Sequence, residues 1–427
     1  MKMKSWLTAA AALCVAAGTT FAAPPSDAAL AEKVREYEQT MAKTPRAEQL
    51  ATRTELIKKL LGDETFAEYS SSQIETVLGL VVADEALRDR AIARLAELKA
   101  QESPEGLNAE LVHTLMQMYA RRGSPTADDV KRMLNDPRLV QLVSKGQGLS
   151  IFSLLGSVRG GGLSDSVETL MKLTRALPET LAPGKADSIA NLYTTLAYTV
   201  PNPSEQLASL QSRALAYLDA DIKSLKGDDA KATSPQIASL EKTRDRLAVI
   251  NGAAPEIEFM WYSEDGSVTK LSDLKGKVVI IDFWATWCGP CISAFPKVRH
   301  LAEHYNGYPV EIVGVTSIQG SHYRTNPQTN EREKIDTKDD TQKEFTLMTE
   351  FMKELNMTWP VGFSKENVFD PRYGVYGIPH IAIIDPAGKV RVNGLNPHGL
   401  TDVQEHALID TILKEFNLAT PDFKPHG

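Results

Sequence analysis

Cysteine is scarce in this chain, which contains three cysteines in 427 residues. Exported proteins that depend on disulfides for stability spread cysteines along the chain, so a structural disulfide framework is excluded. Cys14 lies near the N-terminus, whereas Cys288 and Cys291 are separated by only two residues. A disulfide that closes so short a loop stabilises a fold little, because it removes little loop entropy. The close pair therefore indicates chemistry rather than structural support.

Clusters of lysine and arginine are also missing. The net charge is −8, and no basic block stands out, whereas nucleic-acid binding needs grouped cations that contact phosphates. We therefore expect no nucleic-acid partner.

The chain has no hydrophobic run of the length typical of a transmembrane helix. The uncharged residues 6–21 fall short of the roughly 20 residues that span a bilayer. Lys2 and Lys4 precede this stretch and a small residue, Ala22, ends it, a pattern typical of a secretory signal peptide. Residues 1–22 are predicted to be a signal peptide that directs the protein to the periplasm or cell envelope. Retention of this segment as a membrane anchor is the alternative.

Residues 26–250 show the spacing of amphipathic helices. Apolar residues recur at three- and four-residue intervals. A clear example is the series Leu87, Ala91, Leu95 and Leu98. Ser234 followed by Pro235 predicts a helix cap and a first-turn proline. No fixed repeat period is present, so we expect an all-helical domain folded as a bundle or an irregular solenoid.

The pattern changes near residues 250–255, where a hinge is predicted. Strand-like runs then alternate with helical segments, which is typical of a small α/β domain. The predicted strands are residues 256–262, 268–271, 278–284, 310–316, 381–384 and 390–393, and the predicted helices are residues 289–305, 342–355 and 401–416. The expected fold class is α + α/β, with a second domain over residues 253–420.

Cys288 and Cys291 follow the apolar run of residues 278–284 and begin a predicted helix. The first N–H groups of a helix lack internal partners and the helix dipole is positive there, so a thiolate is stabilised. Cys288 is expected to be the exposed nucleophile, and Cys291, one turn further along, the more buried resolving residue. Pro290 suits this position, because the N–H that it lacks would be unpaired anyway.

Other chemistries fit the sequence less well. A zinc site would need further ligands, and no second cysteine pair exists. His300, Glu303 and His304 spell an inverted zinc-protease pattern, but a water-facing helix surface explains them more simply. A thiol peroxidase would need a proline and a threonine at positions that hold Ile281 and Ala285. We predict no metal and no cofactor.

The motifs together resemble thioredoxin, and most closely the thioredoxin-like, TlpA/ResA-type thiol–disulfide oxidoreductases. The resemblance rests on residues 278–291, the preceding residues 271–277, Pro296 and the sequence Tyr-Gly-Ile-Pro at residues 376–379. It covers residues 253–420 and implies a thioredoxin-like fold for them. The helical region resembles no family that we identify.

The resemblance also implies roles for three further residues. Asp282 matches the buried acid that accepts a proton from the resolving cysteine, and an apolar strand around it favours burial and a raised pKa. Pro379 matches a cis-proline that faces the disulfide, and Trp287 is expected to shield the disulfide. His380 departs from the threonine that is common after this proline. Gly289 departs from the glutamate of some ResA-like reductases, so their specificity is not carried over.

Residues 319–343 form a polar, charged segment after the strand of residues 310–316. That strand is predicted to run parallel to residues 278–284, so both strands end beside the cysteines. The segment is expected either to shape partner access or to be a solvated loop.

The expected function is that of an exported thiol–disulfide oxidoreductase, most consistent with a reductase of protein disulfides. Its partners would be protein disulfide or dithiol substrates and a membrane or periplasmic thiol electron donor. The alternatives make the thioredoxin-like domain an accessory, either of a helical binding or chaperone protein or of a disulfide isomerase. The helical domain is in either case a candidate for binding a protein partner.

Overall fold

The computed structural model describes residues 24–422, except residues 46, 63, 159–162, 200–204, 230, 233, 265–267, 326–328, 330 and 398–401. The predicted signal peptide, residues 1–22, and Cys14 lie outside the described residues. The described part contains no helix with the length and apolar character needed to cross a membrane.

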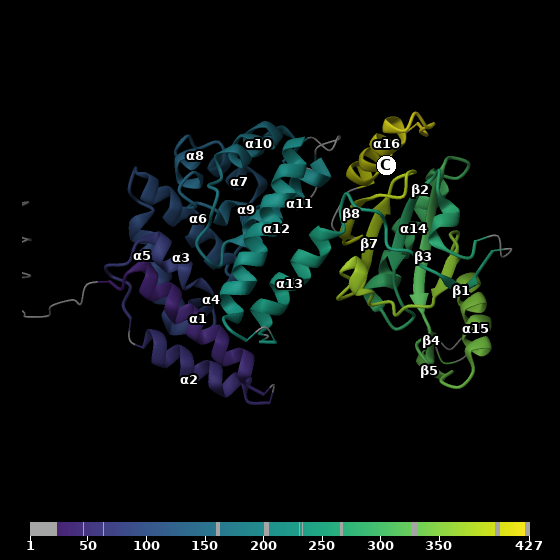
Figure 1. Ribbon diagram of the computed structural model, residues 1–427, viewed down its shortest axis with the longest axis horizontal. Helices are drawn as coiled ribbons and strands as arrows, with labels where there is room; N and C mark the ends of the chain where they lie inside the picture. Colours follow the sequence, from purple (N-terminus) through teal and green to yellow (C-terminus); the bar gives the residue numbers. More distant parts are fainter. Residues whose placement is uncertain are drawn as a thin grey trace, which may run out of the picture.

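The first half of the described chain is helical (Figure 1). Its helices are α1 (Asp27–Lys43), α2 (Gln49–Leu61), α3 (Ser71–Thr76), α4 (Leu78–Val82), α5 (Glu85–Leu98), α6 (Pro104–Tyr119), α7 (Ala127–Leu134), α8 (Arg138–Val143), α9 (Ser150–Leu155), α10 (Val167–Ala176), α11 (Ala186–Thr199), α12 (Glu205–Lys226) and α13 (Pro235–Ala248), with a short 3-10 helix, η1 (Ser164–Ser166).

Local sequence explains where these helices begin and which face they bury. The Ser234 hydroxyl accepts from the Ile237 N–H at 3.1 Å and Pro235 occupies the first turn of α13, as predicted. The four apolar residues at helical spacing in α5 are all buried. Two apolar clusters run through the helices, one centred on α1–α6 and one on α6–α13.

The second half is built around a six-stranded mixed sheet in the order β1-β6-β3-β2-β7-β8. Its strands are β1 (Phe259–Tyr262), β2 (Val278–Phe283), β3 (Val310–Ser317), β6 (Val361–Ser364), β7 (His380–Ile384) and β8 (Val390–Leu395). Strand β3 runs parallel to β2 and to β6, whereas the pairs β2–β7, β7–β8 and β1–β6 are antiparallel. The parallel β2–β3 pair was predicted from the sequence.

Three helices pack in the core cluster that contains both C-terminal cysteines: α14 (Gly289–His304), α15 (Thr341–Glu354) and α16 (Asp402–Glu415). The other face of the sheet packs against η2 (Leu271–Leu274), η3 (Pro371–Tyr373) and the segment before β1. The α + α/β fold class is confirmed.

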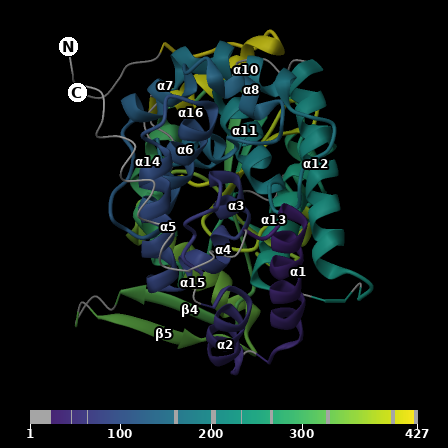
Figure 2. The same cartoon turned by 90° about the vertical axis from the view of Figure 1, so that its left-hand side faces the viewer.

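One predicted strand is absent from the structure, and one polar segment contains strands that were not predicted. Residues 268–271 form only one isolated bridge, between Lys270 and Glu258, before turning into η2. The Asp273 carboxylate accepts from the Thr269 and Lys270 N–H groups, which stabilises a turn in place of a strand. Residues 319–343, for which no secondary structure was predicted, contain a hairpin of β4 (Ser321–Thr325) and β5 (Arg332–Asp336) (Figure 2).

The predicted hinge near residues 250–255 is held by backbone hydrogen bonds. The Asn251 N–H donates to the Val390 carbonyl at 2.8 Å, and the Ala254 N–H donates to the Gly388 carbonyl at 2.9 Å. The Asn251 side chain donates to Gln211 of α12 at 2.8 Å. This segment is therefore bonded to both halves of the molecule. The division into two domains stays a prediction.

Candidate active site

The two cysteines lie where buried strand β2 leads into helix α14. All six residues of β2 are buried, so its end is fixed within the sheet. Cys288 is the N-cap of α14, and its Sγ accepts from the Cys291 N–H at 3.2 Å. Pro290 lies in the first helical turn, as predicted. The Cys291 N–H and the dipole of this turn favour negative charge on the Cys288 sulfur once the bond to Cys291 is broken.

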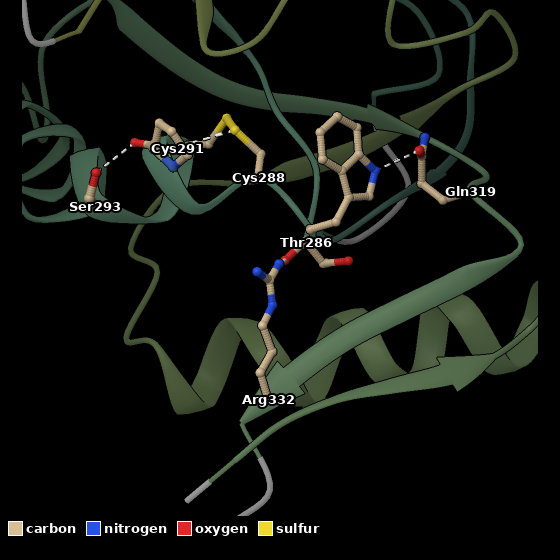
Figure 3. The surroundings of a disulfide bond; sticks show 8 residues. Thr286, Cys288, Cys291, Ser293, Gln319 and Arg332 are labelled. Carbon is tan, nitrogen blue, oxygen red and sulfur yellow. Dashed lines mark hydrogen bonds between the residues drawn. A yellow bond between two sulfur atoms is a disulfide. The ribbon is translucent and has the colours of Figure 1, made fainter.

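Cys288 and Cys291 form a disulfide, with an S–S distance of 2.06 Å and a Cα–Cα distance of 5.3 Å (Figure 3). The prediction that Cys288 is exposed does not hold for this oxidised form, in which Cys288 is 3% and Cys291 1% exposed. The reason is that the bonded Cys288 sulfur folds onto the first turn of α14. The exposed part of the motif is Gly289–Pro290 between the cysteines.

Asp282 is buried on the sheet face that also carries Ile280 and Trp284, and these two belong to the same core cluster as the cysteines. Burial raises the pKa of Asp282 to about 7, and the nearby Glu405 carboxylate adds to the rise. Its Oδ1 atom makes no hydrogen bond among the described residues. A carboxyl group with this pKa exchanges protons near neutral pH, which a base for a cysteine thiol requires. That role stays a prediction.

Sequence reasoning did not find the charged pair that accompanies Asp282. The Lys297 ammonium of α14 lies 3.1 Å from the Glu405 carboxylate of α16. Glu405 is itself buried. No sequence signal distinguishes Glu405 from other acids of an amphipathic helix, because its position depends on how α16 packs.

The peptide bond between Ile378 and Pro379 is cis. Strand β7 begins at the next residue and pairs with β2, with His380 opposite Phe283. The pairing brings Pro379 beside the end of β2 from which the cysteine motif continues. Ile378 packs against the core cluster that contains both cysteines. The catalytic role of Pro379 stays a prediction.

His380 lies on the opposite face of the sheet from Asp282. It is 2% exposed, and its Nε2 lies 2.8 Å from the Asn393 Oδ1. Burial lowers its pKa to about 4, despite the opposing effect of the Asn393 hydrogen bond. His380 is therefore neutral at physiological pH.

Trp287, immediately before the motif, is half-buried and held from two sides. Its indole N–H donates to the Gln319 Oε1 at 2.9 Å (Figure 3), and its ring stacks on Phe369 with centroids 6.1 Å apart. Shielding of the disulfide by Trp287 stays a prediction.

The β4–β5 hairpin reaches the same loop. The Tyr323 N–H donates to the Thr286 hydroxyl at 3.1 Å, and the Arg332 guanidinium donates to the Thr286 carbonyl at 3.3 Å. The polar segment after β3 thus contacts the residues that lead into Cys288. The sequence placed this segment near the cysteines but could not identify Thr286, Tyr323 or Arg332.

The histidines of α14 pack against α16. The rings of His304 and His406 lie 4.1 Å apart, and His300 lies 5.7 Å from His406. Within the described part of the chain, no group of three or more potential ligands is arranged to hold a metal ion.

Comparison with known proteins gives results for the second half of the chain. The model of the Redoxin family matches residues 250–407. Thiol-disulfide oxidoreductase ResA of Oceanobacillus iheyensis is 30% identical over 36% of this chain and 69% of its own length. Its counterpart from Bacillus subtilis is 29% identical over 31% of this chain and 60% of its own length.

Solved structures match the same part of the chain. They include the thioredoxin domain of a thiol-disulfide oxidoreductase from Bacteroides vulgatus, 22% identical over 39% of this chain and 96% of that chain, with a TM-score of 0.27. A thioredoxin family thiol:disulfide interchange protein from Chlorobium tepidum is 20% identical over 38% of this chain and 95% of that chain, with a TM-score of 0.25.

The oxidised cysteine pair at the start of α14, the mixed sheet that positions it and the similarity to the ResA proteins agree with one another. The chain belongs to the ResA-like family of thiol–disulfide oxidoreductases.

Proposed function

We propose that this protein is an exported reductase of protein disulfides that acts through the Cys288–Cys291 couple. The observation that carries the proposal is the disulfide at the N-terminus of α14 with the buried carboxyl group of Asp282 on the same side of the sheet. The Gly-Pro dipeptide between the cysteines is similar to that of reducing thioredoxins, which supports the direction of exchange.

In the reduced enzyme, the Cys288 thiolate attacks one sulfur of the partner disulfide. A bond forms between Cys288 and the partner, and the second partner sulfur leaves as a thiolate. Asp282 then accepts the proton of the Cys291 thiol, and the Cys291 sulfur attacks Cys288. The Cys288–Cys291 disulfide forms, and the partner sulfur that was bonded to Cys288 also leaves as a thiolate. The two partner thiolates then take up protons, one from Asp282 and one from water. Two electrons have moved from the enzyme to the partner, and a dithiol donor at the membrane or in the periplasm returns the enzyme to its reduced form.

The reduction potential of the couple tests the direction. The protein without residues 1–22 is equilibrated in buffers of graded dithiothreitol redox state, and the fraction of free thiol is measured. A potential near −270 mV supports a reductase, whereas a potential near −120 mV identifies an oxidant and contradicts the proposal. Insulin reduction by the same preparation, with Cys288→Ser as the inactive control, checks the activity directly.

Export is tested separately. Residues 1–22 are fused to a phosphatase that is active only outside the cytoplasm. Phosphatase activity supports export, and an inactive, cytoplasmic fusion contradicts it.

A further inference from the structure

The β4–β5 hairpin has two faces of different character. Strand pairing sets Tyr323 opposite Lys334, and Thr325 opposite Arg332. Side chains alternate along each strand, so Tyr323, Arg332 and Lys334 share one face. We call these three residues the basic hairpin face. Ser321 and Asp336 lie at its far end, where the Asp336 carboxylate accepts from the Lys338 N–H at 2.9 Å.

The opposite face of the hairpin covers α15. His322 is buried and its ring lies 5.3 Å from that of Phe351. Arg324 forms ion pairs with Glu333 and Glu350. The charges on this side are therefore compensated within the protein.

The charges on the basic hairpin face are not compensated in this way. Arg332 and Lys334 are exposed, and neither forms an ion pair with any residue that the structure describes. The Arg332 guanidinium lies 5.0 Å and the Lys334 ammonium 5.8 Å from the centre of the Tyr323 ring, which holds both cations against one surface. Two cations that have no ion-pair partner among the described residues form a local site for negative charge, on a chain whose net charge is −8.

The basic hairpin face is fixed close to the disulfide. Arg332 donates to the carbonyl of Thr286, which precedes Cys288 by two residues, and Figure 3 shows Arg332 extending from the hairpin toward Thr286. At about 3.8 Å per Cα step, the guanidinium lies on the order of 10 Å from Cys288. An extended peptide advances about 3.3 Å per residue. A partner residue about three or four positions from the reactive cysteine can therefore meet the basic hairpin face.

We propose that the basic hairpin face selects partner segments that carry Asp or Glu about three or four residues from the disulfide to be reduced. The selection rests on the proposed reductase function. Exposed ion pairs are weak individually and screened by salt. We therefore expect two of them to favour an acidic over a basic segment by roughly 3- to 10-fold in the second-order rate constant of reduction at low ionic strength.

The test uses synthetic peptides of equal length whose single cysteine is joined by a disulfide to 2-thiopyridine. The peptides carry Glu, Gln or Lys at the third and fourth positions on either side of the cysteine. The reduced full chain reacts with each peptide, and release of pyridine-2-thione gives the rate. Each rate is divided by the rate of the same protein with 2,2′-dithiodipyridine, a small neutral disulfide.

The expected order for the wild type is Glu above Gln above Lys, with the differences shrinking at high salt. Arg332→Gln combined with Lys334→Gln removes the preference. Lys334→Glu alone, which touches no hydrogen bond to Thr286 and sets one negative charge beside Arg332, also brings the net charge of the face to zero and removes the preference. Arg324→Gln, a charge change on the paired face, keeps the preference. Equal rates with the Glu and Lys peptides, or a preference that persists in the double variant, overturn the inference. A wild type that fails to reduce even 2,2′-dithiodipyridine overturns the proposed function, and this inference with it.

Discussion

At the scale of single residues, the proposed role of Asp282 links the redox chemistry to pH. Its pKa of about 7 means that the carboxylate, the form that the proposed mechanism uses to accept a proton from Cys291, becomes populated as the pH rises through neutrality. The rate at which Cys291 resolves the mixed disulfide is therefore expected to rise between pH 6 and pH 8. Asp282→Asn is expected to slow this step about 100-fold and to remove the rise. Single-turnover measurement of partner release from reduced enzyme checks both effects.

The stability of the same variant tests whether burial raises the pKa of Asp282. Its pKa rises from the ordinary 3.8 to about 7, so folded protein holds a proton that unfolded protein has lost. Stability contributed by the protonated carboxyl is full below pH 4 and is lost as the pH rises through 7. The Asp282→Asn side chain cannot ionise. The free energy of unfolding of this variant, relative to that of the wild type, should therefore rise by about 4 kcal/mol between pH 4 and pH 8. Urea unfolding curves of the wild type and the variant that shift equally with pH would contradict this. Asp339→Asn, at an exposed position, serves as the control.

At the scale of secondary structure elements, the sequence predicted the parts that local patterns determine. The apolar run of residues 278–284 became β2, and the predicted helices became α14, α15 and α16 within a few residues. Strand β6 was not predicted, because four residues that include Gly362 carry little strand signal and pair only through β3 and β1. The β4–β5 hairpin was missed because polar residues occupy most of both its faces.

The hairpin is expected to depend on the active-site loop. Thr286→Val removes the acceptor of the Tyr323 N–H at nearly constant side-chain volume. An N–H left without a partner costs about 1–3 kcal/mol, so the free energy of unfolding should fall by that amount. Hydrogen exchange in β4 should become faster. Thr286→Ser keeps the hydroxyl group and is the matched control; equal exchange in the two variants would show that the Thr286 contact does not hold the hairpin.

At the scale of the whole molecule, helix α13 contacts the loop that carries Pro379, and Figure 1 shows α13 beside β8. The Arg246 Nε donates to the Gly374 carbonyl at 3.2 Å, and the Asn393 amide donates to the Arg246 carbonyl at 3.2 Å. The Tyr376 hydroxyl donates to Asp245. A displacement of α13 would therefore move the loop of residues 374–379, which ends at the cis-proline three residues after Tyr376.

Gly374 allows this close approach. Its φ is +60°, and a Cβ there would lie 2.9 Å from both the backbone nitrogen and the Cγ of Arg246. Gly276 has a φ of +92° with no atom within 4 Å of a Cβ, so Gly276→Ala has strain without the clash. Backbone strain should lower the free energy of unfolding of each variant by about 1 kcal/mol. Overpacking should lower that of Gly374→Ala by about a further 1–3 kcal/mol. Gly374→Ala alone should also expose residues 249–255 to protease and slow the reduction of insulin. If the two variants behave alike in unfolding, proteolysis and insulin reduction, contact with α13 does not support the cis-proline loop.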